Sequence, residues 1–117
     1  MRFMLILKSN KDSEAGKMPS EESIAATVKY NQEQAKAGIL IDAAGLYPSS
    51  KGARVRVSAG GQKTVIDGPF TESKELVGGY WIIEVKSLEE AIEWAKRSPV
   101  TPGQETEIEV REFIAFE

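Results

Sequence analysis

The stretch VIDGPFTESKELVGGYWIIEV, residues 65–85, combines the strongest strand signal of the chain with a compact turn signal. Residues 80–85 (YWIIEV) are rich in aromatic and β-branched side chains, which is typical of a strand in a sheet. Residues 67–70 (DGPF) indicate a tight turn, and charged side chains follow it at Glu72, Lys74 and Glu75. A turn and a charge cluster beside so apolar a strand indicate either a shaped surface loop or the wall of a site.

A helix and a last strand are predicted after this stretch. Ser87 and Glu90 have the spacing of a capping box, in which two side chains satisfy backbone N–H groups at a helix start. Apolar residues at helical spacing supply its buried face, namely Leu88, Ala91, Ile92 and Ala95. Pro99 and Pro102 end the helix, and residues 107–116 form the last strand.

The N-terminal part predicts a strand and then a helix. Residues 3–7 (FMLIL) form a continuous apolar run, which indicates a strand that is apolar on both faces. Ser20 is a suitable N-cap for a helix that extends to about Ala37 and stops at Gly38. A polar stripe on this helix indicates a solvated face or, alternatively, the lining of a wet cleft; it consists of Thr27, Asn31 and Gln34.

The middle of the chain predicts a strand and a hairpin. Residues 39–47 (ILIDAAGLY) are expected to form the strand, and residues 54–58 and 63–66 the two arms of the hairpin around a Gly-Gly turn. Arg54 and Arg56 share one face of the first arm, where they are either solvated or in contact with an anion.

The order strand, helix, strand, hairpin, strand, helix, strand contains two βαβ units. They predict a ferredoxin-like α+β fold, in which both helices cover one face of an antiparallel sheet and the hairpin is an insertion. We expect a single domain over residues 1–117. Because the strands are apolar on both faces, the face away from the helices needs a cover, and we expect the same face of a second copy in a homodimer. Coverage by residues 9–19 and the hairpin within one chain is the alternative.

Composition argues against several function classes. The net charge is −3, whereas a general nucleic-acid binder normally carries a basic excess, so we expect no nucleic-acid partner. The chain has no cysteine and no histidine, which removes disulfides, thiolate nucleophiles and the commonest general base near neutral pH. No motif for a metal or a phosphate-bearing cofactor occurs, and we expect neither. No apolar stretch is long enough for a membrane span, which predicts no membrane association and a cytoplasmic location.

The run DGPFTESKELVGGYWIIEV, preceded by GLYPS and RVRVSAGGQKTVI, resembles the YCII-related proteins of the DGPF type over nearly the whole chain. The resemblance implies a ferredoxin-like fold of the dimeric α+β barrel type, in agreement with the order above. Relatives in the wider group have a proposed active site built on a His–Asp pair, and a few resemble lactone isomerases and dehalogenases. This chain has no histidine, and Thr27 takes the corresponding helix position, so histidine-dependent chemistry is not expected.

Asp67 is the candidate catalytic residue, because a carboxylate sheltered in a cleft has a raised pKa and can act as a general base. The simpler interpretation is a rigid turn, in which Asp67 accepts backbone N–H bonds and Phe70 is the buried anchor.

The candidate ligand-binding residues are Lys74, Tyr80, Thr27 and Asp42. Lys74 would contact an anionic ligand, and Tyr80 would donate a hydrogen bond. A solvated lysine, a core tyrosine, a solvated helix face and a strand-edge carboxylate are the corresponding structural interpretations.

Two functions follow from these candidates. The first is a small-molecule binding or regulatory dimer with a cleft near the DGPF motif and a possible anionic ligand. The second is a small enzyme of isomerase or lyase type, similar to a dehalogenase, in which a carboxylate replaces the missing histidine. We expect binding in preference to catalysis because the most useful catalytic side chain is missing.

Overall fold

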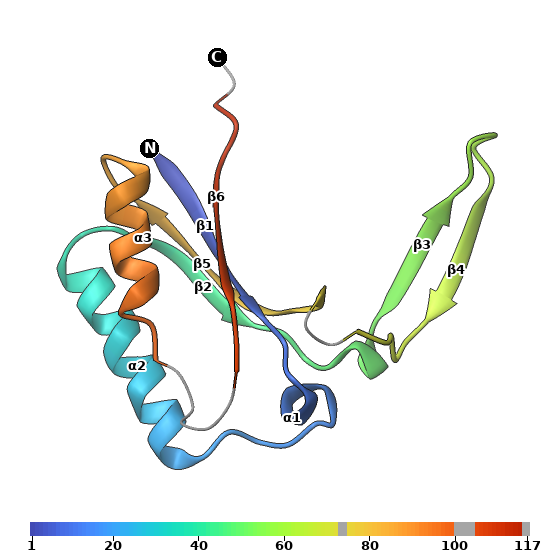
Figure 1. Ribbon diagram of the computed structural model, residues 1–117, viewed down its shortest axis with the longest axis horizontal. Helices are drawn as coiled ribbons and strands as arrows, with labels where there is room; N and C mark the ends of the chain where they lie inside the picture. The colour runs from blue at the N-terminus through green and yellow to red at the C-terminus, as the bar shows by residue number, and fades with distance from the viewer. Residues whose placement is uncertain (73–74, 100–104, 116–117) are drawn as a thin grey trace.

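A four-stranded antiparallel sheet forms the body of the protein (Figure 1). The computed structural model describes residues 1–72, 75–99 and 105–115. The sheet has the order β2-β5-β1-β6, and its strands are β1 (Arg2–Lys8), β2 (Leu40–Gly45), β5 (Val77–Glu84) and β6 (Ile108–Glu112). One long helix connects β1 to β2 and another connects β5 to β6, which is consistent with a ferredoxin-like fold. The predicted class, α+β with an antiparallel sheet, is confirmed.

The two long helices, α2 (Glu21–Lys36) and α3 (Leu88–Lys96), begin where the sequence predicts. The Ser20 hydroxyl accepts a hydrogen bond from the Ser23 N–H, and the Ser87 hydroxyl accepts one from the Glu90 N–H, both at 3.1 Å. These bonds satisfy backbone donors that a helix start leaves unpaired. In the part of the chain that the structure describes, no helix has the length and apolar character needed to cross a membrane.

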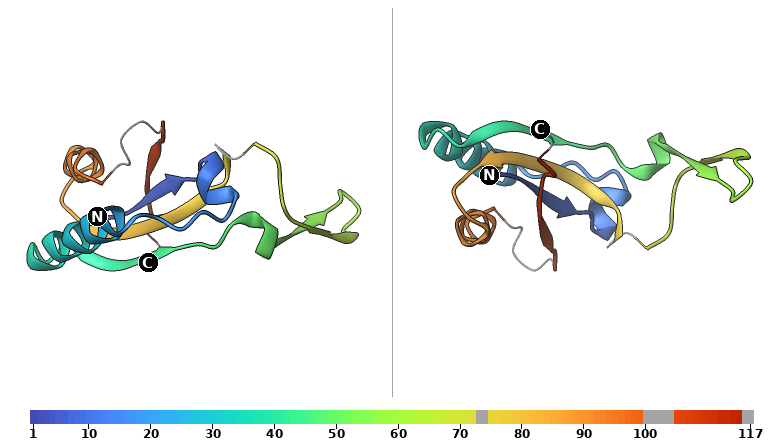
Figure 2. Two further views of the ribbon diagram at one scale, coloured as in Figure 1. Left: turned by 90° about the horizontal axis from the view of Figure 1, so that it is seen from below. Right: turned by 90° about the horizontal axis from the view of Figure 1, so that it is seen from above.

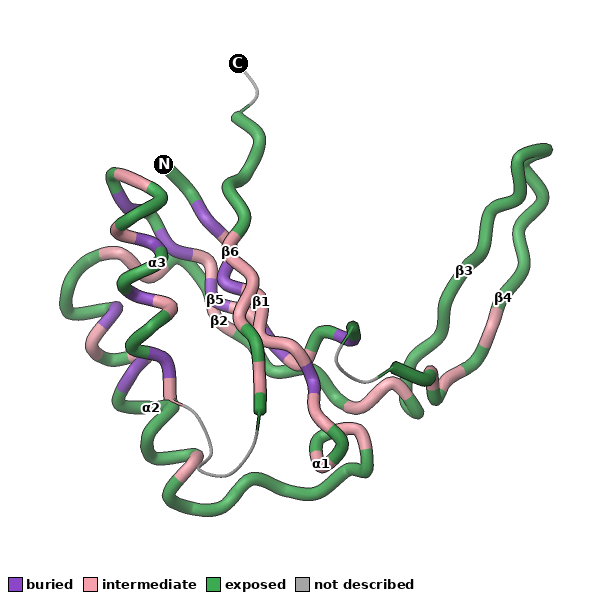
Figure 3. The backbone as a smooth tube through the Cα atoms, in the orientation of Figure 1, coloured by how far each residue is buried: buried purple, intermediate pink, exposed green. Residues whose placement is uncertain are grey.

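The core lies between these helices and one face of the sheet. Purple segments in Figure 3 show buried residues on β1, β5, α2 and α3. Tyr30 from α2 meets Trp81 and Trp94 edge to face, with ring centroids 5.1 and 6.2 Å away. The Tyr30 hydroxyl donates to the carbonyl of Trp94 at 2.6 Å, so α2 is tied to α3 inside the core. The aromatic Phe3 and four aliphatic side chains complete the cluster, namely Leu5, Ile83, Val85 and Ala91.

The connection between β2 and β5 leaves the main sheet. It contains η1 (Ser49–Lys51) and the strands β3 (Ala53–Val57) and β4 (Lys63–Asp67), which pair with each other in a separate two-stranded sheet. This hairpin stands away from the body in each view (Figures 1 and 2). It rises on the side of the main sheet opposite α2 and α3 (Figure 1).

Two details differ from the sequence-based expectation. Residues 11–14 form a single helical turn, α1 (Lys11–Glu14), within the region predicted as a loop, because the Asn10 side chain caps it by accepting from the Ser13 N–H at 2.9 Å. The last strand was predicted over residues 107–116, but β6 ends at Glu112, and residue 116 lies outside the described residues.

Candidate functional site

The sheet face away from the helices is apolar at its centre. Paired residues in an antiparallel sheet share a face, and the pairs Met4–Ile82 and Ile6–Tyr80 alternate with the core pairs. Four residues on this face are half-buried by neighbouring side chains of the sheet, since α2 and α3 pack on the other face: Met4, Ile6, Tyr80 and Ile82. We call the sheet face that carries these four residues the open face.

A bulge in β2 brings Asp42 onto the open face. Leu40 pairs with Ile83, yet Asp42 pairs with Ile82, so one extra residue, Ile41, lies between them. With regular pairing Asp42 would lie opposite Trp81 on the core face, because side chains alternate with a period of two. The bulge therefore moves a carboxylate from the core face to the open face.

Asp42 and Tyr80 form a hydrogen-bonded pair there. The Tyr80 hydroxyl donates to Oδ2 of Asp42 at 3.2 Å. This hydrogen bond, and then the charge of Asp42, raise the pKa of Tyr80 above its ordinary value, so the hydroxyl stays protonated at neutral pH. Its proton is directed at Asp42, which leaves the tyrosine oxygen and the second carboxylate oxygen as acceptors. The pair suits a ligand group that donates hydrogen bonds.

Charged residues border the open face at β6. Glu109 pairs with Ile6 across the strands and Arg111 with Met4, so both lie on this face. Arg111 donates to Glu109 at 2.9 Å, and Lys8 lies 3.6 Å from the same carboxylate. The bond from Arg111, followed by the charge of Lys8, lowers the pKa of Glu109. Within the described residues, by contrast, no basic side chain lies within ion-pair distance of Asp42.

The DGPF turn is held by backbone and serine contacts. The Gly68 N–H donates to the carbonyl of Gly52 at 3.0 Å, and the Phe70 N–H donates to the Ser49 hydroxyl at 2.9 Å. A Cβ atom on Gly68 would lie 1.8 Å from the Ser49 carbonyl oxygen, so glycine is required by close backbone approach. The Gly68–Pro69 peptide is cis.

One expectation about this turn was wrong, the burial of Phe70. Asp67 lies exposed at the end of β4, and the N–H groups of Gly68 and Phe70 donate to Gly52 and Ser49. Phe70 is half-buried, not buried. The Arg54 guanidinium covers one side of its ring, 3.9 Å from the ring centroid. Arg54 thus has a structural contact at the base of the hairpin.

Glu14 completes the junction, although no local sequence pattern indicates this role. Its carboxylate accepts the Ser49 N–H at 2.9 Å and the Ser49 hydroxyl at 2.5 Å. The same hydroxyl accepts from Phe70, so one serine joins α1, η1 and the DGPF turn. These three segments are far apart in the sequence, and only the fold brings them together.

The polar stripe of α2 faces inward at two of its three positions. Asn31 accepts a hydrogen bond from the indole N–H of Trp81 at 2.7 Å. Gln34 is fully buried, and its amide has no hydrogen-bond partner among the described residues. Thr27 is exposed on a helix that packs on the other face of the sheet from Tyr80 and Asp42. The structure does not bring Thr27 to the open face.

The remaining candidates do not gather at one place. Lys74 lies outside the described residues. Asp67 is in the hairpin, whereas Asp42 and Tyr80 are in the main sheet. Of the five candidate residues, the structure therefore brings together Asp42 and Tyr80. No group of three or more acidic residues that could hold a metal ion occurs in the described ranges.

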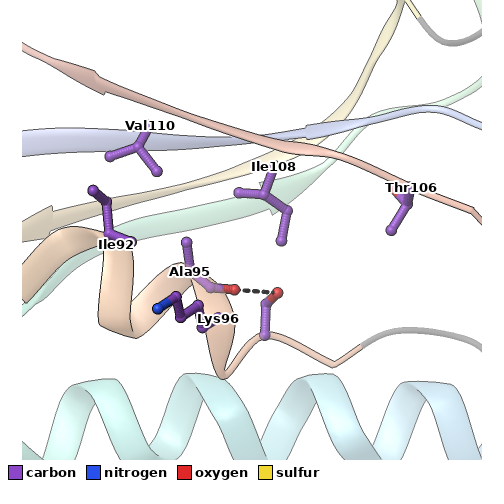
Figure 4. A pocket seen from close by; sticks show the side chains of 7 residues that line it. Ile92, Ala95, Lys96, Thr106, Ile108 and Val110 are labelled. Atoms are coloured by element: carbon purple, nitrogen blue, oxygen red, sulfur yellow. Dashed lines mark hydrogen bonds between the residues drawn. The ribbon is translucent and has the colours of Figure 1, made fainter.

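A groove of about 400 Å³ lies between α3 and β6, on the helix side of the sheet. Ile92 and Ala95 point toward Val110 and Ile108 across it (Figure 4). Among the described residues that line it, Lys96 is the charged one, and it is paired with Glu93 at 3.2 Å. Its described lining includes none of Thr27, Asp42, Asp67 and Tyr80, and it consists mainly of apolar side chains.

The fold and the open face are those of a small α+β protein whose sheet is covered by helices on one side. The chain belongs to the YCII-related domain family, whose model matches residues 1–114. The resemblance noted in the sequence is thereby confirmed. The chain is also similar to an uncharacterized protein of Rhizobium meliloti (strain 1021), with 43% identity over 61 residues. This alignment covers 52% of the chain and 48% of the relative, so it spans about half the length of each protein.

Proposed function

We propose that this YCII-related protein is a small-molecule binding or regulatory homodimer that holds its ligand at the Tyr80–Asp42 pair. The position of the pair carries the proposal, since it lies on a sheet face that neither α2 nor α3 covers. Binding sites typically combine apolar walls with a few placed polar groups, and Met4, Ile6 and Ile82 are apolar neighbours of this kind.

A second copy is the proposed cover for the open face. A two-fold axis places the same surface of both chains in contact, so an apolar centre meets an apolar centre. The half-buried Met4, Ile6 and Ile82 supply that centre. Covering the face turns the Tyr80–Asp42 pair from a surface feature into the polar wall of an enclosed space.

The pair favours a ligand that donates a hydrogen bond, such as a hydroxyl or an amine. The anionic ligand expected from the sequence depends on Lys74 and stays a prediction. The enzyme alternative, a small isomerase or lyase, is less well supported. A general base needs a sheltered position beside its substrate, and Asp67 is exposed on the hairpin.

A ligand screen tests this proposal. A panel of small hydroxylated, amino and carboxylated compounds is scanned by thermal shift, because a ligand that binds the native state raises the melting temperature. For any compound that binds the parent, we expect Asp42→Asn and Tyr80→Phe each to weaken binding about tenfold, the effect of losing roughly 1.4 kcal/mol. Asp67→Asn is the matched control and should bind like the parent.

Three results would count against the proposal. Compounds that bind Asp42→Asn and Tyr80→Phe as tightly as the parent would move the site elsewhere. A loss confined to Asp67→Asn would restore the hairpin carboxylate as the functional group. Turnover of a bound compound, abolished by a carboxylate substitution, would establish the enzyme alternative.

A further inference from the structure

The hairpin formed by β3 and β4 has almost no support within its own chain. Every residue of β3 is exposed, and in β4 only Ile66 is half-buried. The contacts at its base are the Arg54–Phe70 stack and the Gly68–Gly52 hydrogen bond. An isolated two-stranded hairpin is only marginally stable in water, so this one calls for a further partner.

The two faces of the hairpin differ in chemistry. The pairs Ala53–Asp67, Val55–Val65 and Val57–Lys63 lie on one face, which we call the valine face; Asp67 lies at its base. Val55, Val57 and Val65 are 61%, 60% and 67% exposed, so these apolar side chains are not buried within the single chain. The opposite face carries Arg56 beside Thr64. A contiguous run of exposed β-branched residues on one face of a projecting element is typical of an interaction surface.

The dimensions of the chain indicate how much surface awaits a partner. The radius of gyration is 16.0 Å, whereas a compact domain of this length has about 13.4 Å. The accessible surface is 8623 Å², against about 6,300 Å² for a compact monomer of this mass. The surplus of roughly 2,300 Å² exceeds the roughly 800 Å² that each partner buries in a standard stable interface. The hairpin and the open face together account for an extended shape of this kind.

Charge indicates which surface the hairpin meets. The hairpin, residues 53–67, contains the basic residues Arg54, Arg56 and Lys63 and one acidic residue, Asp67. The rest of the chain holds 12 of the 15 basic residues and 17 of the 18 acidic ones. Two hairpins packed against each other would therefore bring two surfaces of net positive charge together. A hairpin against the acidic body of another copy brings opposite charges together, which favours association.

We propose that the hairpin is an arm that lies against the body of a second copy, with the valine face toward it. Its direction fits this role, because it rises on the side of the open face (Figure 1). The arm rests on the homodimer of the proposed function and adds an element to it. On the valine face, Lys63 lies at the far end of the hairpin from Asp67, so the end away from the body carries the positive charge of this face.

Sedimentation equilibrium of two matched variants tests the arm. Val65→Glu places a charge on the valine face, and Thr64→Glu places the same charge one residue away on the opposite face. Both side chains are exposed within the single chain, so neither substitution disturbs the core, and circular dichroism checks the fold. We expect Val65→Glu to raise the dimer dissociation constant at least tenfold and Thr64→Glu to change it less than threefold.

Each other outcome overturns the arm. Equal shifts in the two variants would show a general charge effect with no preference for a face. A dimeric parent with an unchanged Val65→Glu constant would reject the arm and leave the homodimer standing. A parent that stays monomeric at all concentrations would reject the arm and the proposed assembly together.

Discussion

The junction between the hairpin and the body is held by contacts of individual atoms of Ser49 and Gly68. The Ser49 hydroxyl donates to Glu14 and accepts from the Phe70 N–H, so it links three segments through one oxygen. Gly68 lies so close to the Ser49 carbonyl that no side chain fits between them. The motif DGPF is therefore a packing feature first, whose glycine and following backbone N–H groups hold the hairpin against η1.

Gly68→Ala should disrupt this junction. A new Cβ atom would meet the Ser49 backbone oxygen, which cannot move aside as a flexible side chain can. Overpacking of this kind costs typically about 1–3 kcal/mol. Hydrogen exchange should show lost protection at the amides of Gly68 and Phe70. Gly52→Ala is the matched control, since its Cβ would lie an ordinary 3.5 Å from the same oxygen, and equal effects in both would refute the close-approach explanation.

The buried hydroxyl of Tyr30 predicts a pH effect on stability. Burial raises the pKa of Tyr30 from 10.0 to about 12. An unfolded tyrosine loses its proton near pH 10, whereas the folded chain holds it to about pH 12. Between these values the unfolded state binds fewer protons, so the free energy of unfolding falls as pH rises, by about 3 kcal/mol at most. Below pH 10 the stabilising effect is fully present.

Tyr30→Phe isolates this effect from the lysines that titrate in the same range. The stability difference between parent and Tyr30→Phe should shrink from pH 10 to pH 12 in denaturant unfolding curves. A difference that stays constant with pH would mean that Tyr30 titrates as it does in the unfolded chain.

At the scale of elements, the bulge at Ile41 determines which face Asp42 joins. Regular pairing from Leu40 would direct the carboxylate at the core, opposite Trp81. The extra residue shifts by one position which side chains of β2 face the core, so that Ala43 packs against the core and Asp42 contacts Tyr80. The candidate site thus depends on one irregularity in β2.

Deletion of Ile41 should therefore cost far more than its truncation. Without the bulge, β2 must either bury Asp42 among apolar groups or lose its pairing with β5. An unpaired buried charge costs about 3–5 kcal/mol, so unfolding midpoints in urea should fall steeply. Ile41→Ala should cost only about 1 kcal/mol, because the side chain is 48% exposed. Similar midpoints for the two variants would show that the register does not depend on the bulge.

The elements were predictable from the sequence because their signals are local. Ser20 and Ser87 mark helix starts by short-range hydrogen bonds, and the apolar run at residues 3–7 requires burial wherever it lies. Asp42 and Tyr80 were each selected as candidates, but their pairing was not predicted, since it depends on the register between two strands and on a bulge. The contact of Glu14 with Ser49 joins residues 35 positions apart, for which no local pattern exists.

At the scale of the whole molecule, the chain is a thin, open unit. It measures 45 × 42 × 19 Å, with helices on one side of the sheet and the hairpin rising on the other (Figures 1 and 2). Apolar residues are half-buried on the open face and exposed on the valine face. The proposed second copy would cover both surfaces and would also enclose the Tyr80–Asp42 pair.

The measurement that tests this account most directly is the mass in solution of the parent chain and of Ile6→Glu, by sedimentation equilibrium at micromolar concentration. Ile6 lies at the centre of the open face, so a glutamate there would be buried against the second copy. The account predicts twice the chain mass of 12.8 kDa for the parent and the single chain mass for Ile6→Glu. Val28→Glu, which changes an exposed apolar residue on α2, should remain dimeric. A parent at the single chain mass, or an Ile6→Glu variant that dimerises as tightly as the parent, would contradict it.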